Sequence, residues 1–247
     1  MIAARQTVQL ILRAVLFIAL AAGTAHAADT ADGIVAHVLA TYGGAEAIGR
    51  VKTVAAHGTI TDYFSDREGV YSRYAERPGK LRVEITYDDG GELRILNDGS
   101  AWQSGENGLV PARPMTYRSM VYQYTYLDLP MGFADHSVPV SYGGRELVGG
   151  REVYLLKVTP AHSPEIRVYI DAKSYLIRRV AATFRMGIMG GSELATEYGD
   201  FRPESGVLFP HLLTNYAGNI KLSEITLPRI RINAVLPASL FRPSPSP

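Results

Sequence analysis

Residues 80–88 read KLRVEITYD, and this stretch decides the fold. Leu81, Val83, Ile85 and Tyr87 occupy every second position, and charged or polar residues stand between them. Because successive side chains of an extended chain point to opposite faces, the alternation predicts a strand with one buried face and one exposed face. Half-buried strands of this kind are typical of antiparallel sheets.

Similar strand-like runs fill most of the chain on both sides of this stretch. Turn residues such as Gly, Pro, Asn and Asp separate one run from the next. Their regular spacing and mostly neighbour-to-neighbour order predict one large sheet or barrel of about ten or eleven strands. The further runs are 51–63, 68–77, 92–97, 152–159, 165–171, 175–184, 192–201, 207–217 and 221–232.

Two segments depart from the strand pattern. In residues 32–49, Ile34 and Val38 have helical spacing, which predicts an amphipathic helix that covers something larger. Residues 114–129 read PMTYRSMVYQYTYLDL and begin with Pro, which suits the first position of a helix. We interpret 114–129 as a helix, with a strand as the alternative because Tyr and Thr also favour strands.

Some runs are apolar on both faces, notably 175–184 and 207–217. In the first of these, Leu176 and Val180 are expected to face away from Ile177. One explanation is that the sheet curls around an apolar interior and also meets covering elements outside. The other is ordinary packing with scattered apolar residues on the surface. The sequence leaves both open.

The two ends of the chain have their own character. Residues 1–27 read as a cleavable signal peptide, with two Arg, the apolar run VLFIALAA over 15–22 and the cleavage pattern Ala25-His26-Ala27. That run is shorter than the roughly 20 apolar residues that span a membrane. We expect 28–236 to form a single domain and the Pro/Ser-rich residues 237–247 to form a disordered tail.

Composition narrows the compartment and the partners. The chain has no Cys, which excludes disulfides and a lipoprotein anchor, so an exported protein of this kind fits a bacterial periplasm. Removing residues 1–27 takes away two Arg and no acidic residue, so the formal net charge falls from +1 to −1. A near-neutral balance argues against a nucleic-acid-binding protein.

Signals for catalysis, metals and cofactors are weak. The His residues do not form HExxH or another close ligand pattern, and the Gly pairs do not form a nucleotide-binding loop. A GxSxG elbow is absent as well. We therefore expect no enzyme, no metal and no cofactor, and we keep an envelope hydrolase as the unfavoured alternative.

The order of several short motifs resembles the periplasmic outer-membrane lipoprotein-sorting proteins, the superfamily of the carriers LolA and LolB. Each motif is weak alone, and the set covers nearly all of the chain after residue 27. In chain order they are Tyr42-Gly43-Gly44-Ala45-Glu46-Ala47-Ile48, Val51-Lys52-Thr53-Val54, Arg77-Pro78-Gly79-Lys80-Leu81-Arg82-Val83-Glu84, Asn97-Asp98-Gly99-Ser100-Ala101-Trp102, Arg151-Glu152-Val153-Tyr154-Leu155-Leu156-Lys157-Val158, Val168-Tyr169-Ile170-Asp171 and Gly206-Val207-Leu208-Phe209-Pro210-His211.

The resemblance implies a mainly β (α+β) fold: a strongly curved, incomplete antiparallel β-barrel whose open side is covered by the N-terminal and mid-chain helices. It also implies a function, the binding of lipid or lipoprotein acyl chains in a hydrophobic cavity and their transport across the periplasm. The implied partners are an inner-membrane transporter and an outer-membrane acceptor. A lipid or stress sensor on the same fold is the alternative among binding proteins.

The resemblance also implies site residues. In the lipoprotein chaperone an Arg in a Lys-Arg-Pro strand end helps to hold a lid closed, and Arg77 is the matching position here. The flanking Lys is replaced by Glu76, and a strand-end Arg before a turn is the alternative explanation. Met side chains adapt to variable apolar partners, which makes TFRMGIMGG at 183–191 a candidate lip of the cavity, with an apolar hairpin end packed on the core as the alternative. The candidate cavity or lid residues are Arg77, Trp102, Met115, Met120, Tyr122, Tyr126, Met186 and Met189.

Overall fold

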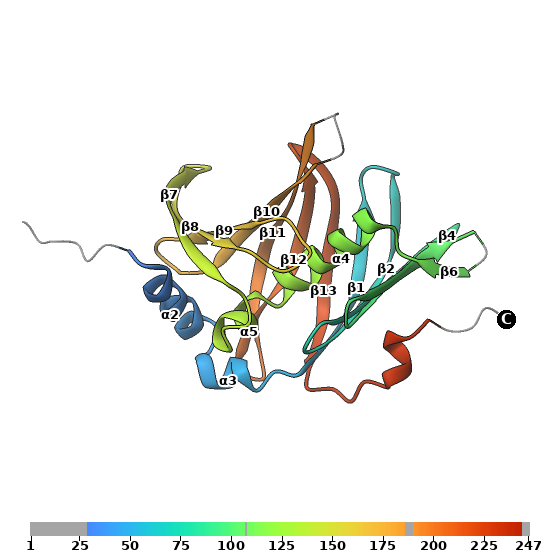
Figure 1. Cartoon of the computed structure of the whole chain (residues 1–247), viewed down its shortest axis with the longest axis horizontal. Helices are drawn as coiled ribbons and strands as arrows, with labels where there is room; N and C mark the ends of the chain where they lie inside the picture. The colour runs from blue at the N-terminus through green and yellow to red at the C-terminus, as the bar shows by residue number, and fades with distance from the viewer. Residues whose placement is uncertain (1–28, 107, 186–189, 244–247) are drawn as a thin grey trace, which may run out of the picture. The chain divides into compact units, whose positions relative to one another are not determined.

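The computed structural model describes residues 29–106, 108–185 and 190–243. Within them, thirteen strands form one antiparallel sheet in the order β6-β5-β4-β3-β2-β1-β13-β12-β11-β10-β9-β8-β7. Two meanders, β1 to β6 and β7 to β13, are therefore joined by the pairing of β1 with β13. The sheet is curved and open, as expected from the sequence (Figure 1).

The strands have these bounds: β1 Thr53–Asp62, β2 Arg67–Glu76, β3 Lys80–Tyr87, β4 Gly90–Asn97, β5 Ser100–Gly105, β6 Gly108–Pro111, β7 Val140–Val148, β8 Arg151–Val158, β9 Ile166–Asp171, β10 Ile177–Arg185, β11 Gly191–Glu204, β12 Val207–Ala217 and β13 Ile220–Ile232.

The expected number of strands, ten or eleven, was too low. The three strands that sequence reasoning missed are β5, β6 and β7. The first two are six and four residues long, and the third reads VSYGGRELV and is mostly exposed. Strands without a buried face lack the alternation that identifies a strand, whether they are short, as β5 and β6 are, or interrupted by Gly, as β7 is.

Four helices accompany the sheet in the described part of the chain: α2 (Ala31–Thr41), α3 (Ala45–Gly49), α4 (Pro114–Leu127) and α5 (Leu129–Ala134). Residues 114–129 are therefore helical, and the strand alternative is wrong. The edge strands β6 and β7 are consecutive in sequence, so the chain between them must cross the open side of the sheet. Helices α4 and α5 lie on that crossing (Figure 1).

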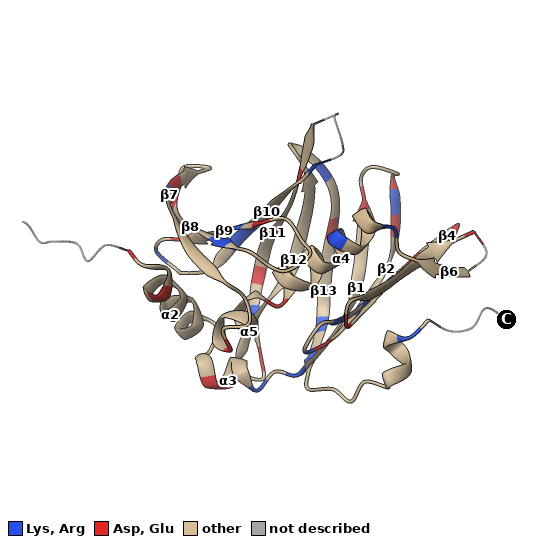
Figure 2. Cartoon of the chain, in the orientation of Figure 1, with Lys and Arg blue, Asp and Glu red and all other residues tan. Residues whose placement is uncertain are grey.

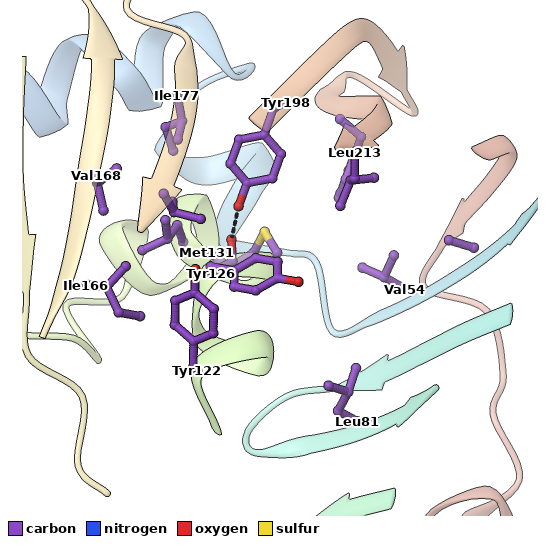
Figure 3. Packing of buried hydrophobic residues seen from close by; sticks show 14 of the residues in the cluster. Val54, Leu81, Tyr122, Tyr126, Met131, Ile166, Val168, Ile177, Tyr198 and Leu213 are labelled. Carbon is purple, nitrogen blue, oxygen red and sulfur yellow. Dashed lines mark hydrogen bonds between the residues drawn. The ribbon is translucent and has the colours of Figure 1, made fainter. Parts of the chain in front are cut away.

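The face of the sheet toward α4 and α5, here called the inner face, carries one large apolar cluster (Figure 3). Two tyrosines of α4 connect the helix to β11. The Tyr198 hydroxyl donates to the carbonyl of Tyr126 over 3.1 Å, and the Tyr122 hydroxyl donates to the carbonyl of Leu194 over 3.2 Å. Buried tyrosines of this kind add apolar area and also satisfy their polar ends.

The opposite, outer face carries much less apolar surface. Its second cluster, here called the outer patch, consists of Val153, Leu155, Tyr169, Ala181 and Ala195. The apolar pattern of 175–184 also reflects an irregularity in the strand, because the β9–β10 register shifts between residues 177 and 179. The shift brings Ile177 and Val180 into the same inner cluster, contrary to the expected opposition.

The C-terminal segment differs from the predicted disordered tail. Residues 238–241 form a short 3₁₀ turn, and the Phe241 side chain is 1% exposed. Arg82 on β3 donates to the carbonyl of Leu240 over 2.9 Å, and Asn97 at the end of β4 donates to the carbonyl of Phe241 over 3.1 Å. One aromatic residue among Pro and Ser is thus enough to hold this segment on the outer face of β3 and β4. Residues 244–247 and the predicted signal peptide lie outside the described residues.

Candidate ligand-binding site

A cavity of about 500 Å³ lies beside the first half of α4, and we call it the α4 cavity. Its apolar wall combines Met115 and Met120 of α4 with Phe184 of β10 and Leu194 of β11. Facing them on β4 is a polar pair, in which Arg94 donates to Glu92 over 2.6 Å. A mostly apolar hollow with a few polar groups is the usual character of a small-molecule site, and its volume lies in the usual range.

A second cavity of about 790 Å³, here called the turn cavity, lies on another face of α4 and further along it. Val121, Tyr124 and Thr125 of α4 form one wall. The turn between β2 and β3 and the polar and Pro-rich segments 137–139 and 159–161 form the rest. The helix is therefore flanked by hollows on two sides, which leaves much of its surface without packing partners.

Arg77 links the β2–β3 turn to the junction of α4 and α5. Its Nε lies 2.8 Å from Oδ1 of Asp128, and its Nη2 lies 2.7 Å from Oδ2 of Asp135. The Arg77 side chain is only 10% exposed. Two residues further on, the Gly79 N–H donates to the Tyr124 hydroxyl over 2.9 Å. Arg77 from the turn and Tyr124 from α4 therefore both hold α4 against the β2–β3 turn.

The electrostatics of this link are uneven. Burial raises the pKa of Asp128 to about 7, and the Arg77 guanidinium, which Asp128 shares with Asp135, lowers it by less than burial raises it. Asp135 is more exposed, and its pKa is lowered by its hydrogen bonds to Ser137 and by Arg77, which outweigh its burial. The link therefore contains one carboxyl that titrates near neutral pH and one that stays ionised well below it.

Beneath α4 and α5 the interior is filled by side chains. Met120, Leu129, Met131 and Phe133 are all buried against the sheet. Two voids described there measure about 30 and 20 Å³, which is the size of a water molecule. An acyl chain can enter this interior only where helix side chains move aside.

Sequence reasoning missed Arg73 of β2, whose side chain lines both small voids and is 5% exposed. Its Nη1 atom is buried and has no hydrogen-bond partner within the described protein. The available signal was its phase, since Arg73 shares a strand face with Tyr71 and Ala75. Because Tyr74 on the other face is also aromatic, the sequence did not show which face of β2 is buried.

The predicted site residues have different places. Met115 and Met120 line the α4 cavity, Tyr122 and Tyr126 are buried beneath the helix, and Arg77 lines the turn cavity. Trp102 was wrongly expected at the cavity: its neighbour Gln103 lines the cavity, and alternation turns Trp102 to the outer face, where it pairs with Ile95. Met186 and Met189 lie outside the described residues.

Other site chemistry is sparse in the described ranges. No group of three or more His, Cys, Asp or Glu there could hold a metal ion. No helix in the described part of the chain is long and apolar enough to cross a membrane. Acidic and basic residues are interspersed on both halves of the sheet (Figure 2).

Comparison with solved structures finds proteins of similar architecture. A putative outer membrane lipoprotein-sorting protein domain from Vibrio parahaemolyticus matches with a TM-score of 0.54 and 13% identity, over 85% of this chain and 95% of that one. A LolA superfamily protein from Nitrosomonas europaea matches with a TM-score of 0.56 and 11% identity, over 87% and 98%. This chain has a LolA-like fold.

A DUF1329 family protein from Desulfovibrio piger matches to the same degree, with a TM-score of 0.56 and 11% identity over 87% of this chain and 98% of that one. No protein-family model matches the sequence, and no curated protein matches it. At these identities the similarity concerns the fold alone, and function must be argued from the site.

Proposed function

We propose that this protein is a periplasmic carrier of a lipid-like ligand, such as a lipoprotein acyl chain or another lipid. The observation that carries the proposal is the apolar α4 cavity on a LolA-like fold, next to a helix crossing that is only partly packed. Met115 and Met120 give this wall a soft, adaptable surface, which suits an acyl chain of variable shape. Within this proposal the predicted signal peptide delivers the protein to the aqueous space where such a carrier works.

In the proposed mechanism α4 and α5 form a lid over the filled interior. The lid is held by Arg77 through Asp128 and Asp135, and by Tyr124 through the Gly79 amide. A ligand enters at the α4 cavity and takes the space of helix side chains as the lid moves outward. An inner-membrane transporter and an outer-membrane acceptor are the partners that would load and unload such a carrier.

The first experiment tests for a ligand. Protein purified from the periplasm of its native host is extracted with organic solvent, and the extract is examined by mass spectrometry. Delipidated protein is then titrated with a fluorescent fatty-acyl probe. We expect a stoichiometric lipid in the extract and saturable binding of the probe. An extract without lipid, together with no saturable binding, contradicts the carrier.

The second experiment locates the ligand. Ser119 lies on α4 and lines the α4 cavity, whereas its neighbour Arg118 is exposed and does not line it. Ser119→Trp fills the cavity, and we expect it to weaken probe binding at least about tenfold. Arg118→Trp adds the same indole outside the cavity and leaves binding unchanged. Equal affinities of the two variants would exclude the α4 cavity as the entry site.

The third experiment tests the lid. Arg77→Ala removes both ion pairs to the α4–α5 junction, so we expect faster probe entry and greater proteolysis near residues 128–135. Arg202→Ala is the matched control, because Arg202 forms an Arg–Asp pair with Asp200 on the surface. Unchanged entry kinetics in Arg77→Ala would show that Arg77 does not hold the lid.

A further inference from the structure

The inner face contains one charge in an apolar setting, the guanidinium of Arg73. On the neighbouring strands its cross-strand partners are Ala56 of β1 and Val83 of β3, which are both buried. Along β2 the next inner-face residues are Tyr71 and Ala75. Burying a cation among such groups has a large desolvation cost unless an anion and hydrogen-bond acceptors offset it.

The described residues do not supply that anion. No ion pair of Arg73 exists among the described residues, and its Nη1 has no acceptor there. Asp128 lines the same 20 Å³ void, but its carboxylate accepts from Nε of Arg77 instead. The two arginines therefore differ in their partners. Arg77, directly after β2, pairs with two carboxylates, whereas Arg73, four residues earlier, pairs with none among the described residues.

The groups around the other void also favour an anion. Tyr42, Tyr126 and Tyr198 line the 30 Å³ void together with Arg73. Burial raises the pKa of all three phenols, to about 12 for Tyr126, so they are neutral. The Tyr42 oxygen accepts a hydrogen bond from the Ile177 N–H, which leaves its own O–H proton to donate. A guanidinium and a phenol donor together match the acceptors of a carboxylate.

We propose that the ligand is an anionic, single-chain amphiphile whose carboxylate binds Arg73 inside the barrel. This inference rests on the proposed carrier function and specifies its ligand class. The two voids are small, so they fit a compact head group, and Leu127 and Met131 of the lid line both of them. When the lid moves, those two side chains vacate the space beside Arg73, and the acyl chain of the ligand occupies it.

The test compares two ligands of equal chain length, palmitate and hexadecanol, by equilibrium dialysis against delipidated protein at pH 8. We expect wild-type protein to bind palmitate at least about tenfold more tightly than hexadecanol. Arg73→Met keeps a long apolar side chain and removes the charge, so the preference for palmitate disappears while hexadecanol still binds. Arg73→Lys retains the charge and keeps most of the preference.

A control and a second readout complete the design. Arg229 is exposed on β13, so Arg229→Met removes one positive charge elsewhere and leaves the preference unchanged. In thermal unfolding, Arg73→Met raises the midpoint of the ligand-free protein, because an uncompensated buried cation has been removed. Palmitate raises the wild-type midpoint and has a smaller effect on Arg73→Met.

The outcomes separate this inference from the carrier function. Equal binding of palmitate and hexadecanol by wild-type protein overturns the anionic ligand and leaves the carrier intact. The same holds if Arg73→Met keeps the preference for palmitate. Binding of neither compound overturns the carrier function, and the assignment of Arg73 falls with it.

Discussion

The two faces of the sheet cover their apolar residues in different ways. The inner face has one continuous apolar cluster covered by helices, whereas the outer face has small apolar patches with separate covers. Over the outer patch run ion pairs, in which Glu193 bridges Arg167 and Arg179. Arg stems can cover apolar surface while their charged ends stay in water. Over β3 and β4 the cover is instead the segment that carries Phe241.

The difference concerns charge more than apolarity. Charged residues over the outer patch, such as Glu193, Arg167 and Arg179, lie near the surface and pair with one another. On the inner side two arginines are buried, and among the described residues Arg77 pairs with two carboxylates whereas Arg73 pairs with none. Binding function is therefore expected on the inner face, where an unpaired buried charge leaves interaction energy available to a ligand.

Two adjacent residues of β8 give the sharpest comparison of the faces. Leu156 belongs to the inner cluster and is 0% exposed, whereas Leu155 belongs to the outer patch and is 5% exposed. We expect Leu156→Ala to lower the free energy of unfolding by about 3 kcal/mol. Leu155→Ala should cost about half as much, because the flexible Arg stems above it can settle into the space. Urea unfolding of both variants measures the difference.

An equal loss for Leu155→Ala and Leu156→Ala would break the comparison, since it would show that the outer patch is packed as rigidly as the interior. A change in the urea dependence of either variant would instead indicate an altered unfolded state. The two variants remove the same atoms from the same strand, so each serves as the control of the other.

Much of the fold follows from local sequence. Strict alternation such as KLRVEITYD fixes a strand and its faces, and turn residues divide one strand from the next. The short strands β5 and β6 at one end of the sheet carry no such pattern, and their pairing comes from the rest of the sheet. The register shift at residue 178 is equally invisible, because a bulge changes the phase without changing composition.

The site was predictable only in part. Met115 and Met120 were predicted from a Met- and Tyr-rich helix that would suit a cavity wall, and both line the α4 cavity. Trp102 was misplaced because its strand was not recognised, so its face could not be assigned. Arg73 was missed because a charged residue in a strand is normally placed on the exposed face. A residue that breaks this rule is informative, but only the structure shows that the rule is broken.

The second prediction concerns the C-terminal cover. Phe241→Ala removes the buried ring that holds residues 238–241 on β3 and β4, so we expect a loss of about 2 kcal/mol in the free energy of unfolding. The loss is smaller than for Leu156→Ala because a short surface segment can detach without opening the sheet. Val235→Ala, at a site that is 97% exposed, is the control and should leave stability unchanged. No effect of Phe241→Ala would mean that the segment only rests on the sheet.

The third prediction uses Asp128, the buried acid at the α4–α5 junction. The pKa of Asp128 is about 7 in the folded protein and near 4 in an unfolded chain, so the folded state holds an extra proton between these values. Stability contributed by this group therefore falls as pH rises from 5 to 8. We expect the wild-type free energy of unfolding, relative to Asp128→Asn, to drop by about 2–3 kcal/mol over that window.

Asp135→Asn controls for this pH dependence, because Asp135 shares the Arg77 guanidinium but has a lowered pKa. Its contribution is present above its unfolded pKa and is lost only at lower pH, so its removal should not alter the slope between pH 5 and 8. If Asp128→Asn has the wild-type slope, then Asp128 is ionised throughout, and the link to Arg77 is a simple ion pair.

The smallest effect is expected on the outer face. Glu193 is about one-third exposed and accepts from Arg167 and, over 3.1 Å, from Arg179. Glu193→Gln keeps the shape and removes the charge, so we expect a loss of about 0.5–1 kcal/mol that shrinks when salt is raised. Asp200→Asn removes an acid paired with Arg202 at the surface and should not move the midpoint. A loss for Glu193→Gln as large as that for Leu156→Ala would mean that the outer face depends on charge as strongly as the inner face depends on packing.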